Sequence, residues 1–254
     1  MLEKPFTRAL VERAINEINH QSAGGPDNVH MKIVKEMKRM MPETLNKVFL
    51  RKAEAETQNT RIKKRKIVLI SKKSNKKNFS QVRPISVISS FYKILSKIIN
   101  RRLIDALEDI IPKNVLAYTK NNSPDRTVKY INDIKDIIIE KEEKAFAIQL
   151  DFKSAYDVLN RKFIYALLET MNVPETIIKK LKNLLEDNEG ILTVNNNIIG
   201  SIELNAGMGQ GDANSCLLYN IATIPIALAL EKSPLIKEIK IKLNEIKITN
   251  NDHP

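Results

Sequence analysis

The sequence is poor in the residues on which several classes of protein depend. A single cysteine, Cys216, occurs in 254 residues, which excludes a disulfide framework and a cysteine-based zinc site. The three histidines, His20, His30 and His253, are scattered along the chain and argue against a histidine metal cluster. Glycine is also scarce, with seven residues in all.

Long apolar runs are missing as well. No stretch approaches the roughly 18–20 apolar residues of a membrane span, and the start MLEKPFTRAL has no signal-peptide core. We therefore expect no membrane partner and an intracellular protein, in the nucleus or cytoplasm. Hydrophobic residues at 43% and charged residues at 28% are typical of a globular chain. Without repeats or a linker, a single domain over residues 1–254 is predicted.

Positive charge is in excess and unevenly placed. The chain carries 42 Lys and Arg against 30 Asp and Glu, a formal charge of +12. The segment from Arg51 to Lys77 alone has a net charge of +9. Its consecutive cations Lys63, Lys64, Arg65 and Lys66 suggest nucleic-acid binding through phosphates, with strong salt dependence. A solvated loop or a localisation signal explains the same composition equally well.

The order of predicted elements indicates an α+β fold. Helical spacing of apolar residues predicts helices over 6–19, from the turn at 22–28 to about 39, from 42 onward, and over 88–109, 124–142, 161–171, 174–187 and 212–231. Short apolar or alternating runs predict strands at 66–71 and 145–150, and hairpins at 191–204 and 236–249. This order does not alternate strand and helix regularly, so a parallel βαβ fold is disfavoured.

Two features suggest chemistry. Asp151 follows the predicted buried strand 145–150, where a carboxylate is well placed to hold Mg²⁺, although a helix cap is the simpler interpretation. Gly207, Gly209 and Gly211 precede a predicted helix, so the backbone there can approach an anionic ligand closely. The alternative for that segment is a tight turn in which Asp212 caps the next helix.

Taken together, these segments resemble the reverse transcriptases of non-LTR retrotransposons of the long interspersed element type. The matching stretches, in family order, are SAGGPDN (22–28), RKIVLISKK (65–73), RPISVISSFYKILSKIINRRL (83–103), LDFKSAYD (150–157) and GMGQGDANSCLLYNIA (207–222). The resemblance implies the fingers and a partial palm of a right-hand polymerase, with helices packed on an antiparallel palm sheet. The fingers and N-terminal helices would take about 1–144 and the palm about 145–254.

The resemblance also implies roles for particular residues. Polymerases of this family use two Mg²⁺ ions to join a dNTP to a DNA primer on an RNA template. Asp151 matches the first metal-binding carboxylate and Phe152 a backbone carbonyl ligand. Lys72 and Arg83 match the cations that hold the incoming triphosphate. The remaining nucleotide-binding positions are Tyr156, which matches the residue beneath the sugar, and Gln210 and Gly211.

Several positions depart from the family pattern. The other two catalytic carboxylates belong to a Tyr/Phe-Ala-Asp-Asp hairpin, and the alignment puts His253 and Pro254 in their places, with Asp252 one position early. We therefore expect a chain truncated at or before that hairpin, without a thumb and inactive alone. Gly209 replaces the arginine common before Gln-Gly-Asp, and LAYTKNN at 116–122 replaces a Gln-x-Gly-Phe template contact.

Three functions remain open at this point. The first is the partial polymerase just described, which would bind RNA template, DNA primer and dNTP. The second is a non-catalytic RNA-binding module that retains the basic fingers. The third is an unrelated Mg²⁺ nuclease built on Asp151, which leaves the RPIS and Gln210 segments unexplained. The sequence does not indicate an oligomeric state.

Overall fold

The structure is a computed structural model that describes residues 4–54, 63–71, 82–112, 115, 123–142, 144–195 and 197–235. These residues form a mixed α/β fold with a four-stranded sheet and helices, consistent with the α+β prediction. They divide into two compact units, one from residues 1–110 and 154–222 and one from residues 111–153 and 223–254. The boundary assumed near residue 144 between fingers and palm stays a prediction.

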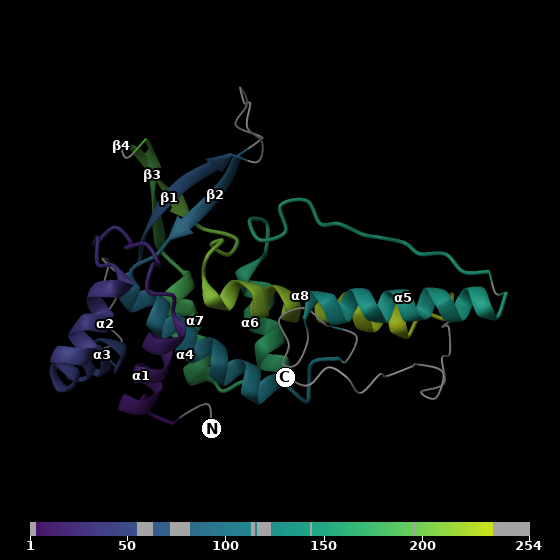
Figure 1. The fold of residues 1–254 in the computed structure, drawn as a ribbon, viewed down its shortest axis with the longest axis horizontal. Helices are drawn as coiled ribbons and strands as arrows, with labels where there is room; N and C mark the ends of the chain where they lie inside the picture. The colour runs from purple at the N-terminus through teal and green to yellow at the C-terminus, as the bar shows by residue number, and fades with distance from the viewer. Residues whose placement is uncertain are drawn as a thin grey trace. The chain divides into compact units, whose positions relative to one another are not determined.

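Six helices of the first unit build its core (Figure 1). They are α1 (Arg8–Glu17), α2 (Met31–Met40), α3 (Pro42–Glu54), α4 (Ser90–Leu107), α6 (Arg161–Thr170) and α7 (Glu175–Leu185). Helix α1 packs on α2, α3 and α4, whereas α7 packs on α4 and α6. Side chains four residues apart, such as Ile99 and Leu103 or Ile164 and Leu168, are fully buried, so each helix turns one apolar stripe inward.

The turn at residues 22–28 joins α1 to α2 and lies against the start of α4. Asn28 has a φ of 55°, a left-handed conformation in which glycine is favoured and asparagine is tolerated. This explains why asparagine can occupy the last position of the turn. A Cβ at Gly25 would lie 2.5 Å from the Ser89 backbone nitrogen, so the turn needs glycine to approach α4 this closely.

The sheet has the strand order β2-β1-β3-β4 (Figure 1). Its strands are β1 (Lys64–Ser71), β2 (Val82–Val87), β3 (Asn188–Val194) and β4 (Asn197–Leu204). The pairs β1–β2 and β3–β4 are antiparallel, and β1–β3 is parallel. The sequence predicts β1 and the β3–β4 hairpin but misses β2, because Pro84 lowers strand propensity. As an edge strand, β2 accepts a proline that a central strand would not.

The second unit contains α5 (Pro124–Glu140), which begins as predicted. The Ser123 side chain accepts a hydrogen bond from the Arg126 backbone N–H at 3.2 Å, and Pro124 occupies the first turn. The predicted buried strand at 145–150 is wrong. Residues 145–150 form no strand, and Phe146, Ile148 and Leu150 are 94%, 82% and 70% exposed. The predicted hairpin at 236–249 lies outside the described residues.

Helix α8 (Ala213–Glu231) contributes residues to both units. Among the residues that the structure describes, it is the one helix that is long and apolar enough to cross a membrane, judged by length and composition alone. The buried polar side chains of Asn214, Ser215 and Asn220 lie on it. A single helix of this length and composition is weak evidence for a membrane span, because core helices of soluble proteins share these properties.

Candidate functional site

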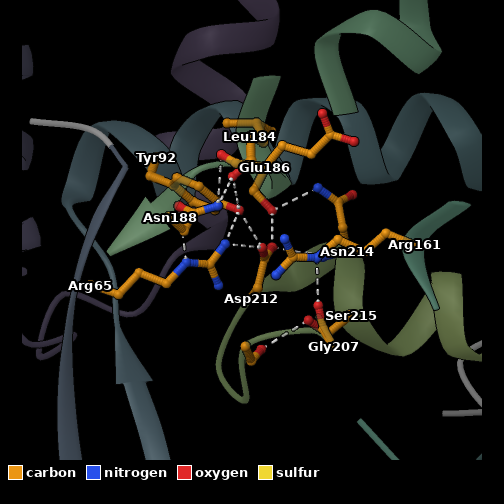
Figure 2. Close-up of polar contacts among 12 residues, drawn as sticks. Arg65, Tyr92, Arg161, Leu184, Glu186, Asn188, Gly207, Asp212, Asn214 and Ser215 are labelled. Carbon is orange, nitrogen blue, oxygen red and sulfur yellow. Dashed lines mark hydrogen bonds and ion pairs between the residues drawn. The ribbon is translucent and has the colours of Figure 1, made fainter. Parts of the chain in front are cut away.

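A buried aspartate stands between the glycine-rich loop and α8. The Asp212 carboxylate, whose side chain is fully buried, accepts the Asn214 backbone N–H at 3.0 Å on Oδ1. This bond satisfies one of the free N–H groups in the first turn of α8, so Asp212 caps the helix as one interpretation of the sequence predicted. Ser96 also donates to Oδ1, and Tyr92 donates to Oδ2 at 2.6 Å (Figure 2).

Arg65 of β1 supplies the positive charge beside this carboxylate. Its side chain is 2% exposed, and its Nη2 atom lies 3.9 Å from Asp212 Oδ2. The same nitrogen donates to the Tyr92 hydroxyl at 2.8 Å, and Nε donates to Asn188 Oδ1 at 3.3 Å (Figure 2). Opposite charges are therefore buried together and hydrogen-bonded, which is the arrangement in which a protein tolerates them.

Tyr92 connects Arg65 to Asp212 through its hydroxyl. The hydroxyl has one proton and lies 2.6 Å from Asp212 and 3.2 Å from the Leu184 carbonyl, so the shorter bond to the carboxylate takes the proton. Its lone pairs then accept from Arg65. Burial raises the pKa of the Tyr92 hydroxyl well above its usual value, the neighbouring Asp212 carboxylate adds to the rise, and the Arg65 charge opposes it.

This raised pKa predicts a loss of stability at alkaline pH. Above pH 10 an unfolded tyrosine releases its proton while folded Tyr92 retains it, so the free energy of unfolding falls as the pH rises toward the folded pKa. We expect the wild type to lose up to about 1.4 kcal/mol per pH unit more than Tyr92→Phe in this range. Urea denaturation at pH 9–11 measures the slopes. The exposed Tyr130→Phe serves as control, and equal slopes for Tyr92→Phe and the wild type would contradict the expectation.

The glycine-rich loop is fixed to the end of β2. The Gln210 carbonyl accepts the Ser86 backbone N–H at 3.0 Å, and the Gly209 carbonyl accepts the Ser215 hydroxyl at 2.9 Å. Gly211 has a φ of 111°, a conformation that side-chain-bearing residues rarely adopt. Arg83 is exposed on the same strand, three residues before Ser86. The loop is therefore hydrogen-bonded to the strand that carries this arginine.

The segment around Tyr156 is joined to the other end of the loop. The Tyr156 carbonyl accepts the Met208 N–H at 2.7 Å, and the Leu159 carbonyl accepts the Gly207 N–H at 3.0 Å. The Tyr156 hydroxyl donates to Cys216 Sγ at 3.6 Å, and its ring centroid lies 5.3 Å from that of Tyr219. Tyr156 thus packs on the first turns of α8, with its side chain half-buried.

Four of the predicted nucleotide-binding residues belong to the first unit, namely Arg83, Tyr156, Gln210 and Gly211. Lys72 lies outside the described residues. Asp151 and Phe152 belong to the second unit, and both are exposed. Among the described residues, no three His, Cys, Asp or Glu side chains cluster in a way that could hold a metal ion.

Lys63 directly precedes β1, which begins with Lys64, Arg65 and Lys66, and burial alternates along these four consecutive cations. Lys63 pairs with Asp187 at 3.1 Å and Lys64 with Glu189 at 3.0 Å. Lys63 and Arg65 are buried, whereas Lys64 and Lys66 are partly exposed. Nucleic-acid binding by Lys63, Lys64, Arg65 and Lys66 stays a prediction. The Arg65 guanidinium donates to Tyr92 and Asn188 inside the protein, and Lys63 is also buried, so Lys64 and Lys66 are the two of the four with partly exposed side chains.

Sequence reasoning missed Tyr92, Ser96 and Asn188 altogether. The available signal was weak: Tyr92 and Ser96 are four residues apart on α4, so they share a face, and polar residues on the apolar face of a helix need buried partners. Nothing in the sequence indicates that Asp212, more than a hundred residues away, is that partner.

The order of these motifs along the sequence defines a class of protein. The chain belongs to the reverse transcriptase (RNA-dependent DNA polymerase) family, whose sequence profile matches residues 63–243, well over half of its length. The motif stretches at 83–103, 150–157 and 207–222 lie inside the matched residues, so the predicted resemblance to reverse transcriptases is confirmed, and transposon relatives are consistent with the non-LTR type.

Two relatives come from transposons. The chain is 22% identical over 235 residues to "Transposon TX1 uncharacterized 149 kDa protein" of Xenopus laevis, an alignment that covers 91% of the chain and 18% of the relative. It is 27% identical over 146 residues to "Probable RNA-directed DNA polymerase from transposon BS" of Drosophila melanogaster, covering 56% of the chain and 16% of that relative. The chain spans less than a fifth of the length of either curated relative.

Proposed function

We propose that this domain binds an RNA template, a DNA primer and an incoming dNTP for RNA-directed DNA synthesis, in the nucleus or cytoplasm. Arg83 would contact the triphosphate, Tyr156 the sugar, and Gln210 and Gly211 the base pair formed by template and nucleotide. In this proposal the described sheet belongs to the fingers, and the segment around Asp151 belongs to the palm.

The hydrogen bond between Ser86 and Gln210 carries the proposal. It holds the glycine-rich loop beside the strand that presents Arg83, so a phosphate-binding cation and a backbone-rich loop lie in one unit. An arginine suits a triphosphate because its planar guanidinium donates two parallel hydrogen bonds to phosphate oxygens. A glycine loop suits the nucleotide because nothing on Gly211 projects beyond the backbone.

We further propose that these 254 residues by themselves do not polymerise. Two Mg²⁺ ions need several shared anionic ligands, and the chain offers Asp151 without an Asp-Asp pair anywhere in its sequence. Asp151 and the Phe152 carbonyl are therefore proposed as one part of a metal site whose remaining carboxylates these residues do not supply.

Two measurements on one RNA–DNA primer–template test both proposals. Fluorescence anisotropy should show binding that weakens steeply between 50 and 200 mM salt, since each phosphate contact releases counterions. Binding should persist in Asp151→Ala, and it should weaken in Lys64→Gln/Lys66→Gln and in Arg83→Gln. Absence of binding at low salt would overturn the proposed function.

Primer extension with Mg²⁺ or Mn²⁺ is expected to give no product from this polypeptide. Nucleotide incorporation that disappears in Asp151→Ala would overturn the proposal of inactivity and would establish Asp151 as catalytic. Nuclease activity that depends on Asp151 would instead favour the third hypothesis drawn from the sequence.

A further inference from the structure

Gly209 lies directly against the Arg65 guanidinium. A Cβ built on Gly209 would lie 2.2 Å from Arg65 Nη1, closer than any real Cβ contact, and 3.0 Å from the Ser86 hydroxyl oxygen. The φ of Gly209 is not positive, unlike those of Gly207 and Gly211, so a side chain at this position would meet no backbone strain of that kind. The need for glycine at residue 209 is therefore steric and is created by one side chain from β1.

Moving the Arg65 side chain away from such a Cβ would cost free energy. The end of an arginine side chain is ordinarily flexible, but this one is 2% exposed and donates to Tyr92 and Asn188. It also balances the Asp212 carboxylate, which is buried and caps α8. Moving the guanidinium would break these bonds and leave a buried charge uncompensated. A side chain at residue 209 would therefore displace the loop and not Arg65.

From these contacts we infer that Arg65 is a positioning residue for the Gly209–Gly211 loop. Its guanidinium pairs with Asp212 at one end of the loop and limits how closely Gly209 can approach β1. At this distance from β1 the Gln210 carbonyl is able to accept the Ser86 N–H. The loop can approach Arg65 this closely only because residue 209 is a glycine and has no Cβ. That the loop contacts nucleotide and template rests on the proposed function. That Arg65 positions the loop is independent of the proposed function.

The interpretation also explains a departure from the family pattern. The family commonly has an arginine before Gln-Gly-Asp, whereas this chain has Gly209. In this structure a guanidinium from β1 already fills the space that a side chain at residue 209 would enter. A second arginine in the loop would place two like charges in one buried site.

A double-mutant cycle tests the pairing. Hydrogen exchange of the Ser86 amide reports directly on loop docking, because that amide donates to Gln210, and the buried Ile178 amide of α7 reports on global unfolding. Gly209→Ala should speed Ser86 exchange about tenfold relative to Ile178 in the wild-type background. In the Arg65→Met background the same substitution should add less than about threefold, because the colliding nitrogen is gone.

Two further variants keep the test decisive. Lys64→Met removes a charge from the neighbouring residue on the other face of β1, and the full penalty of Gly209→Ala should persist there. Arg65→Lys retains the charge but leaves the Nη1 position empty, so it serves where Arg65→Met does not fold, and Gly209→Ala should be tolerated in it. An equal penalty in all four backgrounds overturns the inference.

Primer–template binding by the same proteins separates this inference from the proposed function. Loss of binding in Gly209→Ala, with recovery in Arg65→Lys/Gly209→Ala, supports both. A wild-type protein that binds no primer–template refutes the proposed function, whereas the exchange cycle still decides whether Arg65 positions the loop.

Discussion

Asp212→Ala is expected to lower the free energy of unfolding by about 3–5 kcal/mol, the usual cost of removing one partner from a buried ion pair. The substitution leaves the Arg65 guanidinium uncompensated at 2% exposure. It also removes the acceptor for the Tyr92 and Ser96 hydroxyls and for the Asn214 N–H at the start of α8. Each unsatisfied buried donor adds a desolvation penalty to that of the charge.

Glu189→Ala is the matched control, since it also removes a carboxylate paired with a cation at the start of β1. The Glu189 carboxylate lies 3.0 Å from Lys64 Nζ, and the Lys64 and Glu189 side chains are 42% and 39% exposed, so water can replace it. We expect a change of less than about 1 kcal/mol. Urea denaturation at pH 7 measures both variants. Similar losses in the free energy of unfolding for the two variants would mean that burial does not raise the cost of breaking the Asp212 ion pair.

Secondary structure in the first unit was largely predictable, because its helices bury one stripe of apolar residues with a clear period. The stripe on α4 placed that helix within two residues of its observed start and end. The β3–β4 hairpin was predictable for a similar reason, as two apolar runs joined by asparagines. The strand β2 was not, because its assignment depends on pairing with β1 and lying at a sheet edge.

The segment before Asp151 was predicted as a strand but does not form one. An apolar run favours a buried strand, but the sequence does not specify which strand will pair with it, and none of the described strands does. Whether a side chain is buried depends on which other segments pack against it. Phe146 is therefore exposed although the apolar residues around it in the sequence are typical of a core. The motif residues identified the family despite this, because motif order along the chain does not depend on pairing.

The candidate site was predictable only where the residues are contiguous. Gln210 and Gly211 follow one another, and Asp212 as a helix cap follows from its position before α8. The link from Arg65 to Asp212 spans 147 positions in the sequence and no local pattern encodes it. Alternation along β1 could have indicated that Lys63 and Arg65 face one way and Lys64 and Lys66 the other, but not which face is buried.

Gly207→Ala is expected to have the second large effect, a loss of about 3 kcal/mol in the free energy of unfolding. Gly207 has a φ of 70°, in the left-handed region that costs an alanine roughly 1–2 kcal/mol. Its Cβ would also lie 2.5 Å from the Asp157 carbonyl oxygen and 2.7 Å from that of Tyr156. Both are backbone atoms, so no side-chain rotation relieves the collision, and the Tyr156 segment must move.

Displacement of that segment should be visible separately from the loss of stability. The Gly207 carbonyl accepts a hydrogen bond from Arg161 Nε at 2.9 Å, and the Tyr156 carbonyl accepts the Met208 N–H. In Gly207→Ala the Met208 amide should therefore exchange faster than the buried amides of α7, and primer–template binding should weaken.

Gly200→Ala in β4 provides the control for Gly207→Ala. A Cβ at Gly200 meets no atom within 4 Å, and its φ is not positive, so alanine there should leave stability unchanged or raise it slightly. The two substitutions are chemically identical and differ in the backbone φ of the glycine and in the atoms around the added methyl group. Equal stabilities in urea denaturation would therefore refute the fixed attachment of the Tyr156 segment to the glycine-rich loop.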